Sequence, residues 1–75
     1  MKFTEWLKEK GFSSKVTRDY ESRLKRALRL LEAETVCDTS LKELDDVPEF
    51  QNLSMSVKSQ LRHSIRLYLQ YTKNE

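Results

Sequence analysis

The sequence contains one cysteine, one proline, one glycine and one histidine in its 75 residues. The lone cysteine, Cys37, cannot form an internal disulfide or a cysteine-based zinc site, so it is expected as a reduced thiol or a small buried side chain. So few glycines and prolines leave no turn residues for a β-meander or sandwich. No apolar run approaches the roughly 18 residues that span a bilayer, and Glu5 interrupts the N-terminus where a secretory signal would be apolar. The sequence predicts one all-α domain over residues 1–75, located in the cytoplasm and without contact to a membrane.

Apolar residues recur at helical spacing near the N-terminus. Phe3, Trp6 and Leu7 fall at i, i+3 and i+4, which predicts a helix over 3–10. Gly11 can adopt the left-handed conformation that ends such a helix, and the next residue, a phenylalanine, is expected to fold back on Leu7.

Two longer stretches predict the two main helices. A helix over about 14–33, capped by Ser13 or Ser14, has the strongest periodicity, and Leu30 falls outside its apolar stripe. The expected apolar positions of this helix are Val16, Tyr20, Leu24, Ala27, Leu28 and Leu31. A last helix is expected over about 55–73, starting from Ser54 or Ser56. Its expected inward positions are Val57, Leu61, Ile65 and Tyr68, with Ser64 and Thr72 on the same side.

The segment between the long helices carries a shorter one. Ser40 followed by Glu43 is a capping-box pattern, and Leu41 and Leu44 would then point inward. Pro48 either ends this helix or begins a new first turn. With Phe50 and Leu53 expected to fill the core, the sequence predicts four helices in all.

Charge is distributed by segment. Residues 13–31 hold six cations against two acids, residues 32–53 hold seven acids against one lysine, and residues 54–73 hold four cations and no acid. Each long helix is therefore expected to have one apolar and one basic side, and a basic helix can lie along a DNA groove and neutralise phosphates. The predicted grip on DNA depends on the two basic sides facing the same way after folding, and on the arginines not being paired with the acids of residues 32–53.

The sequence contains few residues that could form a catalytic or a metal site. Nucleophilic catalysis needs a nucleophile, a base and an orienting group, and Cys37 and His63 are the only such pair in the chain. The acidic residues around Cys37 are expected to raise the pKa of its thiol, and one histidine is too few for a metal site. The sequence predicts no enzyme, no catalytic residue, no metal, no cofactor and no small-molecule substrate.

Two segments resemble a known family. Phe3-Thr-Glu-Trp-Leu7, followed by Ser14-x-x-Thr17-x-x-Tyr20-x-x-x-Leu24, looks like the first two helices of the N-terminal core-binding domain of tyrosine recombinases and phage integrases. Ser56-Val-Lys-Ser-Gln-Leu61-Arg-His-Ser-Ile-Arg-Leu-Tyr68-Leu-Gln-Tyr71 is similar to that domain's final helix. Residues 35–53 match loosely. The resemblance implies a SAM-like four-helix orthogonal bundle that contacts DNA with its second and fourth helices.

The resemblance also implies partners and site residues. Double-stranded DNA and other recombinase protomers are the expected partners, with association to the nucleoid, and the family's catalytic residues belong to a separate C-terminal domain that is absent from this chain. His63-Ser-Ile-Arg66 imitates the family's catalytic His-x-x-Arg, but Tyr71 follows it too closely to be the family's nucleophile. The implied DNA contacts are Lys15, Arg18, Ser22, Lys25, Arg26, Arg29, Lys58, Ser59, Arg62, Arg66 and Lys73.

Two other functions fit the composition. A helical protein-interaction module with an acidic partner is the first alternative, and an exposed apolar patch of Leu30, Leu67 and Leu69 would favour it. A compact helix-turn-helix regulator is the second. It is weakened because no short glycine-containing turn joins two helices of the usual length.

Overall fold

All regular secondary structure in the described part of the chain is helical. The computed structural model describes residues 2–73. These residues form α1 (Phe3–Glu9), α2 (Ser14–Leu31), α3 (Ser40–Asp45), α4 (Pro48–Gln51) and α5 (Met55–Lys73). The predicted all-α class and the positions of both long helices are confirmed, while the middle segment contributes two short helices instead of one.

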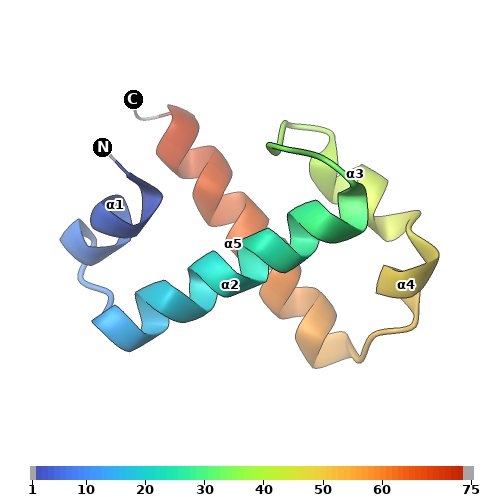
Figure 1. Ribbon diagram of the computed structural model, residues 1–75, viewed down its shortest axis with the longest axis horizontal. Helices are drawn as coiled ribbons and strands as arrows, with labels where there is room; N and C mark the ends of the chain where they lie inside the picture. The colour runs from blue at the N-terminus through green and yellow to red at the C-terminus, as the bar shows by residue number, and fades with distance from the viewer. Residues whose placement is uncertain (1, 74–75) are drawn as a thin grey trace.

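The two long helices cross and form two layers. In Figure 1, α5 passes behind α2, α1 lies at one end of the molecule, and α3 and α4 lie at the other. Because there are only two layers, the domain is flat, with extents of 34 × 23 × 15 Å. The long helices therefore each keep one side exposed along most of their length.

The turn from α1 to α2 follows the local signals in the sequence. Gly11 has a φ of 99°, a conformation that glycine adopts without the penalty of a Cβ atom. The N–H of Phe12 donates to the carbonyl of Leu7 at 3.2 Å, which closes the end of α1. The Ser13 hydroxyl accepts from the N–H of Val16 at 3.2 Å and caps α2.

The other end of α2 differs from the prediction. The helix ends at Leu31, and Glu32 takes a left-handed conformation with φ 54° and ψ 41°. The N–H of Ala33 donates to the carbonyl of Leu28 at 3.0 Å, a bond that satisfies one of the last helix carbonyls. Since a left-handed residue at this position is usually glycine, the sequence contained no signal for it.

The predicted capping box of α3 is wrong. The Ser40 hydroxyl accepts from the N–H of Cys37 at 2.8 Å, so it closes the preceding turn and is buried. The N–H of Glu43 donates to the backbone carbonyl of Thr39 at 3.0 Å instead. Pro48 begins the first turn of α4, which is one of the two predicted alternatives. Its missing N–H costs nothing there, because the first N–H groups of a helix have no acceptor within the helix.

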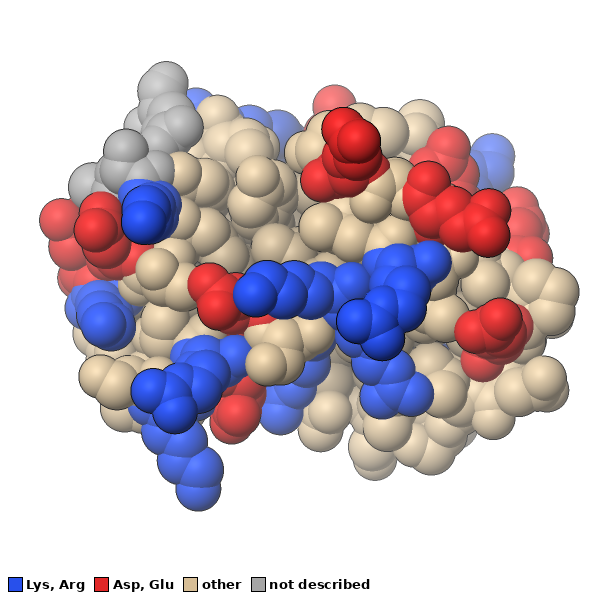
Figure 2. Space-filling view, in the orientation of Figure 1, with Lys and Arg blue, Asp and Glu red and all other residues tan. Residues whose placement is uncertain are grey.

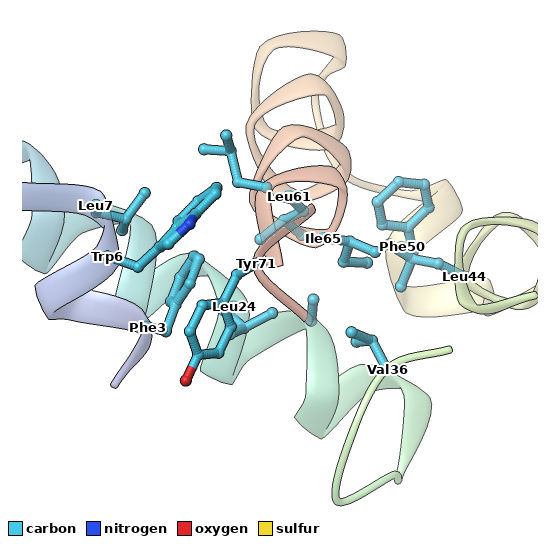
Figure 3. Packing of buried hydrophobic residues seen from close by; sticks show 12 residues of the cluster. Phe3, Trp6, Leu7, Leu24, Val36, Leu44, Phe50, Leu61, Ile65 and Tyr71 are labelled. Atoms are coloured by element: carbon cyan, nitrogen blue, oxygen red, sulfur yellow. The ribbon is translucent and has the colours of Figure 1, made fainter. Parts of the chain in front are cut away.

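One hydrophobic cluster joins the helices. Figure 3 shows Phe3 and Trp6 of α1 beside Tyr71 near the C-terminal end of α5, while Phe50 and Ile65 lie farther along the cluster. The Phe3 ring centroid lies 5.6 Å from that of Tyr71, and Tyr68 adds an edge contact to Phe3 at 5.2 Å. The apolar side of α5 is thus covered by α1 at one end and by α3 and α4 at the other, with α2 between them.

The buried side of each long helix is rotated slightly from the predicted one. Val16 was expected inside but is 36% exposed, whereas the neighbouring Thr17 is 2% exposed. In α5, Tyr71 is buried and Tyr68 only half-buried, although Tyr68 was the predicted core position. The cause is α1, which packs on the ends of both helices and covers positions that the periodicity alone leaves outside.

A substitution at Thr17 tests this rotation. The Thr17 hydroxyl oxygen is buried and has no hydrogen-bond partner, and an unpaired buried hydroxyl costs about 1–3 kcal/mol. Thr17→Val keeps the shape and removes the hydroxyl, so we expect the free energy of unfolding in urea to rise by about 1 kcal/mol. The matched control is Thr72→Val, because Thr72 is exposed and its hydroxyl donates to the carbonyl of Leu69. A Thr17→Val protein less stable than the wild type would contradict the buried position.

Candidate nucleic-acid interface

The basic side of α2 is exposed along the whole helix. We call this surface the α2 basic face. It consists of the six predicted residues Lys15, Arg18, Ser22, Lys25, Arg26 and Arg29, all of them exposed. In Figure 2, cationic side chains gather over α2 on the side that faces away from α5. The structure therefore brings together all the predicted DNA contacts of this helix.

Few acids neutralise this face. Lys25 lies 3.7 Å from Glu21, with the two side chains 72% and 42% exposed, and such a pair is held weakly in water. The other four cations of the face have no ion pair among residues 2–73. The face therefore offers a line of cations that are free to contact an anionic surface.

The acidic segment approaches the C-terminal end of the face. Arg26 and Arg29 border a shallow groove of about 440 Å³ whose other lining residues include Glu32 and Glu49. These carboxylates lower the positive potential at that end without forming an ion pair within 4 Å. The two carboxylates offset only part of the charge at that end, because residues 23–31 hold four cations and no acid. In the N-terminal half of α2, Asp19 and Glu21 balance Lys15 and Arg18.

Two of the five predicted contacts on α5 are used inside the domain. Arg62 forms an ion pair with Asp45 of α3, and its guanidinium lies over the ring of Phe50, 5.3 Å from the centroid. The Lys58 ammonium lies 5.9 Å from the same ring. Both cations are half-buried and hold α5 to α3 and α4. This arrangement counts against their expected role as DNA contacts.

The remaining contacts predicted on α5 do not join the α2 basic face. Ser59, Arg66 and Lys73 are exposed and lie opposite the residues that α5 buries, such as Leu61 and Ile65. Because the two helices pack through their apolar sides, their basic sides point away from each other. In Figure 1 the two helices form separate layers. The expectation that the two basic sides face the same way is therefore wrong.

The histidine and the tyrosine of the catalytic-like segment pack against other aromatic rings of the domain. The His63 ring packs 5.5 Å from that of Tyr20, and Tyr71 is buried in the aromatic cluster with Phe3 and Trp6. Across residues 2–73 there is no group of three or more histidine, cysteine or acidic side chains that could hold a metal ion.

Cys37 is exposed, and the expectation for its thiol is wrong. Hydrogen bonding to the Thr39 hydroxyl, 3.1 Å from the sulfur, lowers the pKa of Cys37. Further hydrogen bonds from the Thr39 backbone and the Ser40 hydroxyl act in the same direction, while the charge of Glu43 raises the pKa. Hydrogen bonds favour the thiolate, and they outweigh an acid whose charge is screened by solvent.

The reactivity of Cys37 tests this environment. Since the hydrogen bonds stabilise the thiolate, its alkylation by iodoacetamide should reach half of the maximal rate at a lower pH than that of a free thiol. Thr39→Val should move this midpoint to higher pH, and Glu43→Gln should move it to lower pH. A midpoint that Thr39→Val leaves unchanged would show that the Thr39 hydroxyl has no effect on the thiol.

Within residues 2–73, no helix combines the length and the apolar character that crossing a bilayer requires. Comparison of the chain with protein-family models, with curated proteins and with solved structures finds no match. The function therefore has to be inferred from the geometry and charge of the domain.

Proposed function

We propose that this chain binds duplex DNA through the α2 basic face. The observation that carries the proposal is a line of five exposed cations on a single side of an 18-residue helix. Of these five, only Lys25 has an ion pair among residues 2–73, a weak one with Glu21. A helix of this length spans about 27 Å, and the major groove of B-form DNA is wide enough to admit it. Cations spread along that length can neutralise several phosphates at once, with Ser22 among them as a hydrogen-bonding group.

We further propose that the domain serves an integrase-type site-specific recombinase as a non-catalytic DNA-binding part. The support is the resemblance of residues 3–24 and 56–71 to the core-binding domain. If α3 and α4 are counted as one helix interrupted at Pro48, residues 2–73 contain four helices, the number in the SAM-like orthogonal bundle that the resemblance implies and that we propose as the fold. In this proposal other recombinase protomers on the same DNA are the further partners, and the nucleoid is the site of action.

The geometry reduces the set of residues that can contact DNA. Lys58 and Arg62 contact Phe50, and Arg62 also pairs with Asp45, so we assign both residues to packing. Arg66 and Lys73 face the opposite side of the flat domain. We therefore assign the grip on the duplex to the α2 basic face and no part of it to α5.

The alternative of a protein-interaction module gains no specific support. Leu67 is buried, and Leu30 and Leu69 are half-buried against the core, so the apolar patch that would favour it does not form. The large hydrophobic side chains exposed among residues 2–73 are Val16 and Met55, which lie on different helices. Duplex DNA remains the partner that the free cations suit best.

Two substitutions on the face test the proposal. We expect Arg26→Gln combined with Arg29→Gln to weaken binding to a labelled duplex by about tenfold at low salt, because two phosphate contacts are lost. The slope of log K against log salt should fall by about two. Fluorescence anisotropy over a range of salt concentrations measures both quantities, and glutamine preserves the helix.

The matched control is Lys2→Gln combined with Lys42→Gln, which removes the same charge from positions outside the face. We expect this pair to weaken binding much less and to leave the salt slope nearly unchanged. Arg66→Gln should likewise stay within about twofold of the wild type, since Arg66 lies on the other side. If both double variants lost the same duplex affinity, net charge alone would explain the effect, and the proposal would be contradicted.

A further inference from the structure

A shallow polar pocket lies where α1 meets the N-terminal end of α2. It has a volume of about 310 Å³ and is lined by Thr4, Lys8, Ser14, Thr17, Arg18 and Glu21. Two helices that are separated by the Gly11 turn supply these side chains. Of the six, only Arg18 belongs to the α2 basic face, so the pocket extends that surface toward α1.

The first turn of α2 adjoins this pocket through Ser14 and contains N–H groups without a partner. The Ser13 hydroxyl accepts from the N–H of Val16, and the Ser13 carbonyl accepts from that of Thr17. The N–H groups of Ser14 and Lys15 have no acceptor among residues 2–73. No acidic residue lies in this turn, so the positive end of the helix dipole is uncompensated and favours an anion.

A second, independent feature of the pocket is the Thr17 hydroxyl. Thr17 lines the pocket and is 2% exposed, and its hydroxyl oxygen has no hydrogen-bond partner in the described structure. Buried hydroxyl groups are nearly always hydrogen-bonded. A buried donor without an acceptor, on a residue that lines a cationic pocket, is explained if an anion supplies the acceptor.

The charges around the pocket favour an anion as well. Lys8 and Arg18 approach from different helices, and neither forms an ion pair among residues 2–73. Glu21 is the one acid in the lining, and it lies 3.7 Å from Lys25. Two cations without an ion pair therefore oppose a single carboxylate, which is weakly paired with Lys25.

We propose that this pocket binds one phosphate group of the nucleic-acid backbone. Lys8 and Arg18 supply charge, and the Thr17 hydroxyl and the first-turn N–H groups of α2 supply hydrogen-bond donors. The chemistry is that of a phosphate oxyanion. Its source, the DNA backbone, rests on the function proposed above. One phosphate held at this point would fix the position of the duplex along the α2 basic face, because contacts to phosphates set the register of a protein on DNA.

A titration with inorganic phosphate at constant ionic strength tests the pocket by itself. We expect saturable shifts of the backbone amide signals of Ser14, Lys15 and Thr17. Lys8→Gln and Arg18→Gln should each weaken phosphate binding by about threefold, as expected for exposed charge-assisted contacts, whereas Glu21→Gln should strengthen it. Lys42→Gln, on α3, is the matched control and should have no effect.

Thr17→Val separates binding from folding. We expect this variant to bind phosphate about threefold more weakly although its stability is not reduced. Phosphate affinity equal to that of the wild type, or shifts spread over all the cations, would overturn the site.

A duplex titration identifies the source of the phosphate. Lys8→Gln should lower the salt slope of duplex binding by about one, and Lys42→Gln should leave it unchanged. Suppose that the wild type binds phosphate at the pocket but Lys8→Gln has the salt slope of the wild type in duplex binding. The pocket would then take free phosphate, and its place on DNA would be overturned. A chain that binds no duplex at all would instead overturn the proposed function, while the phosphate titration still decides whether the pocket binds the anion.

Discussion

The packing of α2 against α5 through their apolar sides determines where the charged side chains of this domain can lie. A helix that buries one side must present its charged residues on the other. Because α2 and α5 form the two layers of a flat molecule, their basic sides are directed outward and apart. The two helices are similar in charge, but they cannot grip the same stretch of DNA with their full basic sides.

The acidic segment completes this division of charge. Residues 32–53 carry seven acids, and Figure 2 shows acidic side chains concentrated toward the end of the molecule formed by α3 and α4. Asp45 pairs with Arg62 of α5, and Glu32 and Glu49 line the groove beside Arg26 and Arg29 of α2. The domain is therefore polar along its long direction, and such an asymmetry orients a protein as it approaches an anionic surface.

Local signals in the sequence were sufficient for the elements of the fold. Gly11, Ser13 and Pro48 act on the residues next to them, so their roles could be predicted without knowledge of the packing. Glu32 in a left-handed conformation and the buried Ser40 hydroxyl could not be predicted, because each depends on how the chain connecting α2 to α3 folds back.

The candidate site was predictable only in part, for the same reason. The exposed cations of α2 follow from periodicity, since a helix that buries one side exposes the other. The pairing of Arg62 with Asp45 joins two helices, so no spacing rule indicates it. Lys8 was missed because the first twelve residues carry almost balanced charge. Only folding brings Lys8 beside Arg18 and the buried Thr17.

The most direct test of the central claim is to follow the backbone amide signals of the domain while a short DNA duplex is added. The account predicts that the shifts concentrate on the exposed residues of α2 and on the junction between α1 and α2, and that the signals of Arg66 and Lys73 stay in place. Shifts centred on the exposed side of α5, or no shifts at a salt concentration near 50 mM where phosphate contacts are strong, would contradict it.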